Sequence, residues 1–176
     1  ELLEKGCENL IAHIEIVQKS GVRPIVCLNA FHTDSPAELA LVRKIAEQHG
    51  AEAALSDHWL RGGAGAIELA EKVLDVTRQE PHFRYLYDLQ MPVKERIERL
   101  AATIYGAKGV TYTDKALAKI RSIDADPNLR GLGICMAKTH LSLSHDPDWK
   151  GRPTGWELPI QDVMVYGGAG YVVPIA

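Results

Sequence analysis

The sequence predicts an α/β fold in which a mostly parallel sheet with flanking helices is followed by a smaller α/β subdomain. Two observations predict this fold class. Between residues 24 and 55, a strand, a helix and a second strand follow one another in the order and length of a βαβ unit. After residue 131 the chain changes to short apolar runs separated by glycine and proline, a pattern typical of strands and loops.

Helices and strands alternate in the first part of the chain. Apolar residues at helical spacing predict a first helix that stops at Gly21. The continuous apolar run at residues 24–29 is typical of a strand buried on both faces of a parallel sheet. The capping-box sequence at residues 35–38, with proline at the first helical position, predicts a helix that ends at His49. Residues 51–55 form the second predicted strand.

Further helices are predicted after a glycine-rich turn at residues 61–65. The inner face of the next helix is expected to carry five residues at helical spacing: Ile67, Ala70, Val73, Leu74 and Thr77. Pro92 then opens a helix that Gly106 ends, and Thr113 caps a shorter one.

The last part of the chain has the character of strands and loops. Strands are predicted within residues 131–137, 158–160, 162–166 and 171–175. A soft boundary is expected within residues 78–92, which begin with a polar break. We therefore assign residues 1–80 to the sheet domain and residues 81–176 to the smaller subdomain.

The composition excludes several classes of function. The 176 residues carry 20 Lys and Arg against 23 Asp and Glu, so no basic surface is expected for nucleic acid or for an anionic membrane. No apolar run is long enough to cross a bilayer. The cysteines Cys7, Cys27 and Cys135 have neither disulfide nor metal-site spacing, and are typical of reduced thiols in a cytoplasmic protein.

Two loops that follow the predicted strands are candidates for binding, because open parallel sheets bind ligands beyond the carboxyl ends of their strands. Asn29 can donate and accept hydrogen bonds and could read the edge of a base; alternatively it caps the strand, and Asp34 only helps to start the helix. Trp59 could stack on a flat ligand or be a core residue. The glycines at residues 62–65 could bind an anion but lack the Lys and Ser/Thr of a P-loop.

Residues 135–145 form the densest polar stretch, and they leave two alternatives open. Lys138, Thr139 and Ser142 could contact a phosphate or a carboxylate, or they could belong to a solvated loop. The potential metal ligands of this stretch are Cys135, His140 and His145. Their spacing matches no zinc pattern, so no metal site is expected. The sequence contains no nucleophile elbow, and the catalytic residues stay unknown.

Eight segments in a fixed order carry a resemblance that covers nearly the whole chain. They are ENLIAHIEIVQKSGV, PIVCLNAFHTDSPAEL, DHWLRGGAGAIELA, LYDLQMPVKERI, IYGAKGV, ICMAKTHLSLSHDP, GRPTGWELPI and GGAGYVVPI. Together they resemble the C-terminal part of formate–tetrahydrofolate ligase, also called 10-formyltetrahydrofolate synthetase. The resemblance implies that residues 1–80 are part of a P-loop-type ligase domain.

The resemblance implies an enzyme of one-carbon metabolism that joins formate to the N10 position of tetrahydrofolate. ATP and Mg²⁺ are implied cofactors, commonly with a monovalent cation, and formyl phosphate is the implied intermediate. The implied partners are the small molecules tetrahydrofolate, formate and ATP, and the full-length enzyme is expected to be a homo-oligomer. The implied location is the cytoplasm, with the mitochondrion left open for a eukaryotic source.

The resemblance also implies residues on the folate side of the site. Trp59 matches the aromatic position that the family places against the pterin ring. Leu86 and Leu89 fall in the segment that lines the other side of that slot. No second aromatic residue stands at Gln90 or Met91, so the slot is expected to be one-sided.

Two further motifs of the family are matched by polar segments of this chain. Asn29, Phe31 and Asp34 match the NxFxTD motif, and a nucleotide-facing role is expected for them from their place at a strand end. The CMAKT motif contributes three more matches, to which no role is assigned: Lys138, Thr139 and Ser142.

The two ends of the sequence bear on activity. The chain opens inside a helical pattern and stops inside an apolar run, so we expect it to be a piece of a larger protein. The resemblance places the P-loop and its lysine upstream of Glu1, and we therefore expect the chain alone to be inactive. The alternatives are a non-catalytic folate- or nucleotide-binding fragment, or a partner subunit that completes a site on a separate P-loop chain.

Overall fold

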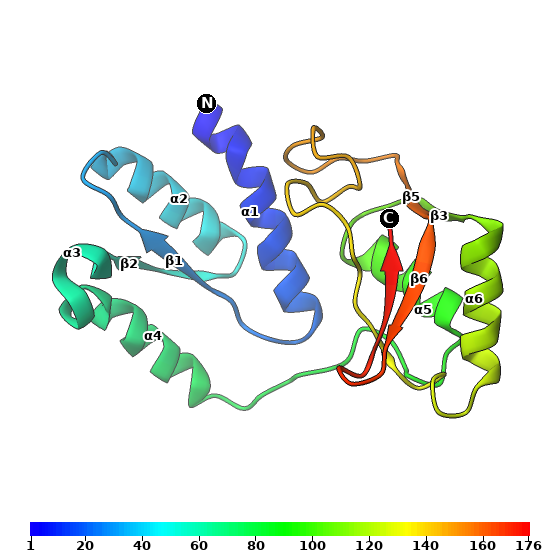
Figure 1. The fold of residues 1–176 in the computed structure, drawn as a ribbon. Coiled ribbons are helices and arrows are strands. Elements are labelled where there is room, and N and C mark those ends of the chain that lie inside the picture. The colour runs from blue at the N-terminus through cyan, green and yellow to red at the C-terminus, as the bar shows by residue number, and fades with distance from the viewer. The chain divides into compact units, whose positions relative to one another are not determined.

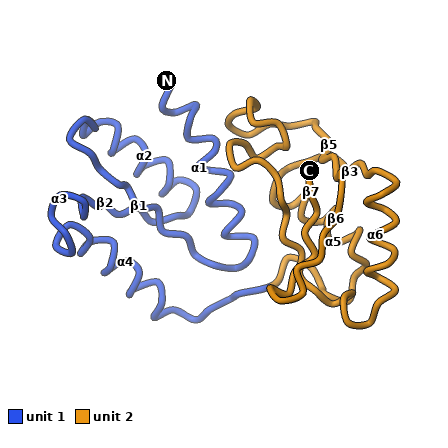
Figure 2. Tube along the Cα trace, in the orientation of Figure 1, with its two compact units in different colours: residues 1–84 blue, residues 85–176 orange.

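The structure, a computed structural model, describes residues 1–176 and divides into two compact units, residues 1–84 and residues 85–176 (Figure 2). Both units contain helices and strands, which confirms the predicted α/β class (Figure 1). The strands form three small sheets instead of a single larger one, and three of the four strand pairings are parallel. None of the helices combines the length and the apolar character needed to cross a membrane.

Unit 1, residues 1–84, contains the predicted βαβ unit. Its elements in chain order are α1 (Leu2–Lys19), β1 (Ile25–Asn29), α2 (Pro36–Gln48), β2 (Glu52–Ser56), α3 (His58–Arg61), the 3-10 helix η1 (Gly62–Ala66) and α4 (Ile67–Thr77). Strands β1 and β2 are parallel, and their register runs from Ile25 opposite Glu52 to Asn29 opposite Ser56. This arrangement confirms both predicted strands and the helix between them.

Ser35 fixes the start of α2. Its hydroxyl accepts a hydrogen bond from the Glu38 N–H, and the Glu38 carboxylate accepts one from the Ser35 N–H at 3.0 Å. These two reciprocal bonds confirm the predicted capping box. The hydrogen bonds from Ser35 also hold the pKa of the Glu38 carboxyl below its ordinary value.

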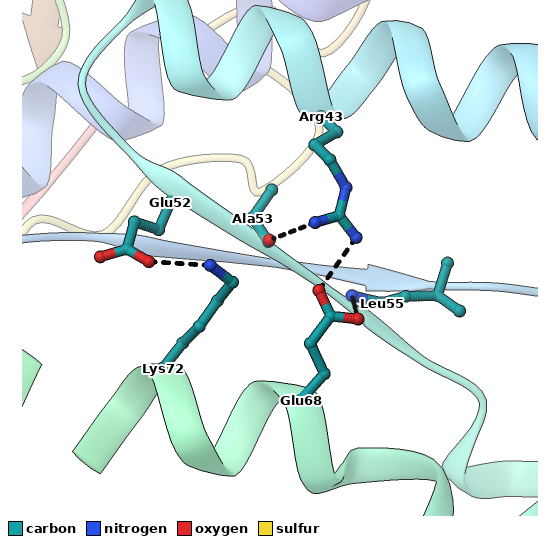
Figure 3. A network of polar contacts seen from close by, with 6 residues as sticks. All are labelled: Arg43, Glu52, Ala53, Leu55, Glu68 and Lys72. Carbon is teal, nitrogen blue, oxygen red and sulfur yellow. Dashed lines mark hydrogen bonds and ion pairs between the residues drawn. The ribbon is translucent and has the colours of Figure 1, made fainter. Parts of the chain in front are cut away.

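The core of unit 1 lies on one face of its two-stranded sheet. Its buried residues come from α1, the two strands, α2 and the residue ahead of β2; they are Ile14, Leu28, Ala46, Ala51 and Ala53. On the opposite side of the strands from α2 lies α4 (Figure 3). Helix α2, which is the crossover between the two parallel strands, therefore covers one face of the sheet, and α4 covers the β2 part of the other face.

Two predictions for unit 1 are wrong. Strand β1 is not buried on both faces, because α4 packs mainly against β2 and leaves Cys27, at the centre of β1, exposed. The five residues predicted for the inner face of α4 are all exposed. That helix instead turns Glu68 and Lys72 toward the strands, where they bond the Leu55 N–H and the Glu52 carboxylate (Figure 3).

Unit 2, residues 85–176, combines two helices with two small sheets. Its elements are α5 (Val93–Thr103), β3 (Gly109–Tyr112), α6 (Asp114–Ala125), β4 (Gly133–Ile134), β5 (Glu157–Ile160), β6 (Asp162–Tyr166) and β7 (Tyr171–Ile175). Strand β3 pairs with β5 in parallel, while β7 pairs with β4 in parallel and with β6 antiparallel. Sequence analysis predicted both helices and the later strands but missed β3, which has only four residues.

One hydrophobic core holds unit 2 together. It joins both helices to strands of both sheets, and its members include Val93, Ile97, Trp156, Leu158 and Ile160. The indole N–H of Trp156 donates to Pro153 O at 3.1 Å, so this buried ring also satisfies its polar atom.

Candidate functional site

The loops that follow β1 and β2 lie side by side at the carboxyl ends of the two strands. The register places Asn29 opposite Ser56, and the next residue, Ala30, donates its N–H to Ser56 O at 2.9 Å. Trp59, in α3, donates its indole N–H to Ala30 O at 2.8 Å. The two loops that sequence analysis selected therefore form one surface.

Phe31 and Trp59, which we call the aromatic pair, form the apolar part of this surface. Their ring centroids are 5.6 Å apart and their planes differ by 18°, which is a stacked arrangement. Phe31 is 49% exposed and Trp59 is 47% exposed, so neither ring is buried in a core. The pair presents a flat aromatic surface that the bond to Ala30 holds in place and that a ligand can reach.

Asp34 and Asn29, the two polar residues predicted beside the aromatic pair, differ in whether their side chains are free to bind a ligand. The Asp34 carboxylate accepts a hydrogen bond from the Phe31 N–H at 2.8 Å, and the Asp34 N–H donates to Phe31 O at 3.0 Å. This carboxylate therefore closes the turn that positions Phe31. Asn29 ends β1 with an exposed side chain, so its amide is open to a ligand.

The glycine-rich turn holds α3 in position. Arg61 donates its Nε–H to both carboxylate oxygens of Asp57, at 2.7 and 2.9 Å, which lowers the pKa of Asp57 and raises that of Arg61. A methyl group on Gly65 would lie 2.4 Å from Asp57 Oδ1 and 2.8 Å from His58 N. Gly65 is thus required for the close approach of the turn to the end of β2, while Arg61 is already paired with a carboxylate.

The folate-side leucines predicted in unit 2 lie in the segment before α5. Leu86 is half-buried, and Leu89 is exposed and borders a cavity of about 270 Å³ together with residues that include Asp124 and Arg130. Tyr87, between the leucines, accepts a hydrogen bond at its hydroxyl oxygen from Ile134 N–H at 2.8 Å. This contact ties the segment to β4. That the leucines face Trp59 stays a prediction.

Lys138 is bound within its own loop. Its ammonium donates to Thr139 O at 3.0 Å and to Ser142 O, and it lies 4.8 Å from the centroid of the Tyr105 ring. Desolvation lowers the pKa of Lys138. These contacts favour the alternative in which Lys138 shapes a loop over the alternative in which it binds an anion.

The two hydroxyl residues beside Lys138 also bond to the loop. Thr139 Oγ1 accepts a hydrogen bond from the Leu141 N–H at 3.2 Å. Ser142 is buried, and its hydroxyl donates to Trp149 O and lies 2.9 Å from Ser144 Oγ. The CMAKT residues are therefore engaged in local bonds. No group of three or more His, Cys, Asp or Glu side chains is arranged to hold a metal ion.

Sequence analysis missed three features that shape these sites. It did not identify the stack of Phe31 on Trp59. The sequence places both residues just after predicted strands, but it does not give the strand register that brings their rings together. It did not identify the buried Ser56, whose Oγ lies 2.9 Å from His58 Nδ1 at the start of α3. It also gave no role to Arg96, whose buried guanidinium donates to two backbone carbonyls just ahead of β4.

These features are those of an α/β protein with an exposed aromatic surface at the carboxyl ends of parallel strands, which is the place where open parallel sheets bind ligands. A sequence model of the formate–tetrahydrofolate ligase family matches residues 1–176. The formate–tetrahydrofolate ligase of Desulforapulum autotrophicum is 54% identical over 176 residues, covering 100% of this chain and 30% of that protein. That of Lawsonia intracellularis is 52% identical over 174 residues, covering 99% of this chain and 29% of the relative. The chain belongs to the formate–tetrahydrofolate ligase family, and it spans about 30% of the length of these relatives.

Proposed function

We propose that this chain is part of a formate–tetrahydrofolate ligase and that the aromatic pair stacks on the pterin ring of tetrahydrofolate. The aromatic pair itself is the observation that carries the proposal. It lies at the strand ends where α/β proteins bind ligands, and both rings are about half exposed. Stacking of a flat heterocycle on an aromatic side chain contributes about 1–3 kcal/mol.

Phe31 belongs on the folate side in this proposal, together with Trp59. The sequence suggested a nucleotide-facing role for Phe31; we propose the folate side instead, because its ring stacks on the indole of Trp59. Asn29 keeps the proposed nucleotide-facing role because its side chain is exposed, whereas Asp34 supports Phe31. Leu86 and Leu89 keep the proposed role of lining the other side of the pterin slot.

The chemistry that we propose for the complete enzyme is transfer of a phosphoryl group from ATP to formate, which leaves ADP. The tetrahydrofolate amine then attacks the carbonyl carbon of formyl phosphate, the bond from that carbon to the phosphate oxygen breaks, and phosphate and the amine proton are released. This chain's residues do not fit a triphosphate–Mg²⁺ site. Arg61 is paired with Asp57, Lys138 is bound to backbone carbonyls, and no carboxylate cluster is present. We therefore assign formate activation to the rest of the ligase polypeptide, and a cytoplasmic homo-oligomer remains our expectation for the complete enzyme.

Activity of the isolated chain tests this assignment. We expect the purified chain to form no 10-formyltetrahydrofolate from formate, ATP and tetrahydrofolate, because it lacks a cradle for the triphosphate. Robust ATP-dependent product formation, followed by chromatography, would contradict the assignment and would show that these 176 residues hold a complete site.

Calorimetric titration with tetrahydrofolate tests the stacking role. Trp59→Ala and Phe31→Ala should each weaken binding by roughly 1–3 kcal/mol, which is about 5- to 150-fold in Kd. Trp149→Ala is the matched control, because that indole is 44% exposed but lies in unit 2, against His145. An unchanged affinity in folded Trp59→Ala protein would rule out the stacking role.

A further inference from the structure

The outer edge of strand β2 is closed by side chains. Arg43 Nη1 donates to Ala53 O at 3.1 Å, and the Leu55 N–H donates to the Glu68 carboxylate at 3.3 Å. The same Glu68 carboxylate, in α4, is 3.0 Å from Nη2 of Arg43, in α2. This ion pair joins the two helices across the edge of β2 (Figure 3). Because Ala53 O and the Leu55 N–H already have side-chain partners, this edge of β2 is blocked against pairing with a further strand.

The outer edge of β1, in contrast, is open. Alternate residues of a strand direct their backbone groups to opposite sides, and the bond from Ala30 N to Ser56 O fixes which residues face β2. The N–H and C=O groups of Ile25, Cys27 and Asn29 therefore point away from β2. No other strand of the structure pairs with β1 on that side.

The sequence of β1 fits a strand inside a sheet better than an edge strand. Its residues form a continuous apolar run from Ile25 to Leu28, without the charged or proline residues that usually protect an exposed edge. Parallel sheets are normally covered on both faces, yet Cys27 is exposed at the centre of the strand. Strand β2 has the opposite character, since its edge carries the charged network.

We propose that the open edge of β1 is the docking site for a further parallel strand, supplied by the part of the ligase polypeptide that this chain does not include. The chain covers 30% of the Desulforapulum autotrophicum relative, so most of that protein lies outside the matched region and is available to supply the strand. Parallel strands are joined by crossover connections, usually helical, and the rest of the polypeptide is long enough to supply one. Because the outer edge of β2 is blocked, we expect the further strand to be added at the outer edge of β1.

This arrangement has a consequence for the candidate site. A parallel strand next to β1 ends beside Asn29, so the loop that follows the added strand borders Asn29 and Phe31. The remainder of the ligase thus reaches the site from the β1 side and not from beyond Trp59. The proposal rests on family membership, and it holds whether or not the aromatic pair binds folate.

Thiol labelling of Cys27 tests the proposal directly. The measurement uses a Cys135→Ser background, because Cys135 is also exposed, while Cys7 is buried and its thiol has a pKa raised mainly by desolvation. The labelling rate is compared between this chain and a full-length hybrid in which the rest of the Desulforapulum autotrophicum relative is joined to it at the aligned position. We expect labelling of Cys27 to be at least about 100-fold slower in the hybrid.

A proline substitution tests the strand pairing itself. Cys27→Pro removes an N–H that points away from β2, so the isolated chain should melt at the same temperature as its matched control, Cys27→Ala. In the hybrid, Cys27→Pro should lower the melting temperature relative to Cys27→Ala, because the N–H is then needed for the added strand.

Three results would overturn the proposal. The first is equal labelling of Cys27 in the chain and in the hybrid. The second is equal melting of the proline and alanine hybrids. The third is a dimer of the isolated chain, seen by light scattering, that already protects Cys27 and so assigns the edge to a second copy. Should the hybrid fail to fold, the same labelling of a cysteine placed at the matching position of the complete relative decides the question.

Discussion

Replacing Gly65 by alanine should destabilise unit 1 and displace the aromatic pair. The added methyl group would lie 2.4 Å from Asp57 Oδ1 and 2.8 Å from both Asp57 C and His58 N. Two of these three atoms are backbone, so rotation of a side chain cannot relieve the overlap. Overpacking of this kind costs about 1–3 kcal/mol. Because the shift must move α3, it also moves the Trp59 ring away from Ala30 O.

Gly63→Ala is the matched control, because nothing lies within 4 Å of a methyl group at that position. Unfolding is followed by far-UV circular dichroism for both variants. For a unit of this size each kcal/mol corresponds to about 4–8 °C, so we expect Gly65→Ala to melt roughly 5–20 °C below Gly63→Ala. Tetrahydrofolate affinity should fall in Gly65→Ala alone. Equal melting temperatures for the two variants would refute the packing argument.

Two further predictions concern stability away from the candidate site. Asp162 accepts hydrogen bonds from Lys115 and Lys119, which hold the pKa of its carboxyl well below its usual range. A depressed folded-state pKa contributes stability that is present above the unfolded value of about 3.9 and is lost as the pH falls further. Asp162→Asn should therefore lower the melting temperature at pH 7 and flatten its dependence on pH below about 4; parallel curves for variant and parent would contradict this. Gly21→Ala should also destabilise unit 1, because Gly21 has a φ of 73° and its methyl group would overlap the His82 carbonyl, whereas an unchanged denaturation midpoint would argue against that contact.

The sequence predicts local structure well where a single segment contains the whole signal. The capping box at Ser35 and the apolar run at residues 24–29 each depend on neighbouring residues, and the structure confirms both elements. Strand β3 was missed because its four residues lie between two stronger helix signals. The prediction for the inner face of α4 was wrong because Glu68 accepts a hydrogen bond from the Leu55 N–H and Lys72 donates one to the Glu52 carboxylate. Both partners lie in β2, outside the helix whose pattern was used for the prediction.

The candidate site shows the same limit. Residues at the strand ends could be selected because topology alone places such loops at the ligand-binding edge of a parallel sheet. The stack between Phe31 and Trp59 could not, because it depends on the register of β1 against β2. Lys138 was a reasonable anion ligand from its residue type. Its hydrogen bonds go to two backbone carbonyls of its own loop, and the order of side chains in a sequence does not predict such bonds.

The tryptophans show why residue type alone does not assign a role. Trp59 and Trp156 both donate the indole N–H to a backbone carbonyl, at 2.8 and 3.1 Å. Trp156 is 3% exposed and packs in the core of unit 2, where its large apolar surface stabilises the fold. Trp59 makes the same kind of hydrogen bond but leaves about half of its surface exposed. The bond therefore fixes the orientation of the ring, while the ring contributes less to stability through burial than Trp156 does. An aromatic ring held in this way at a strand end gains its full contact area only when a flat ligand covers it, which is why we place the pterin there.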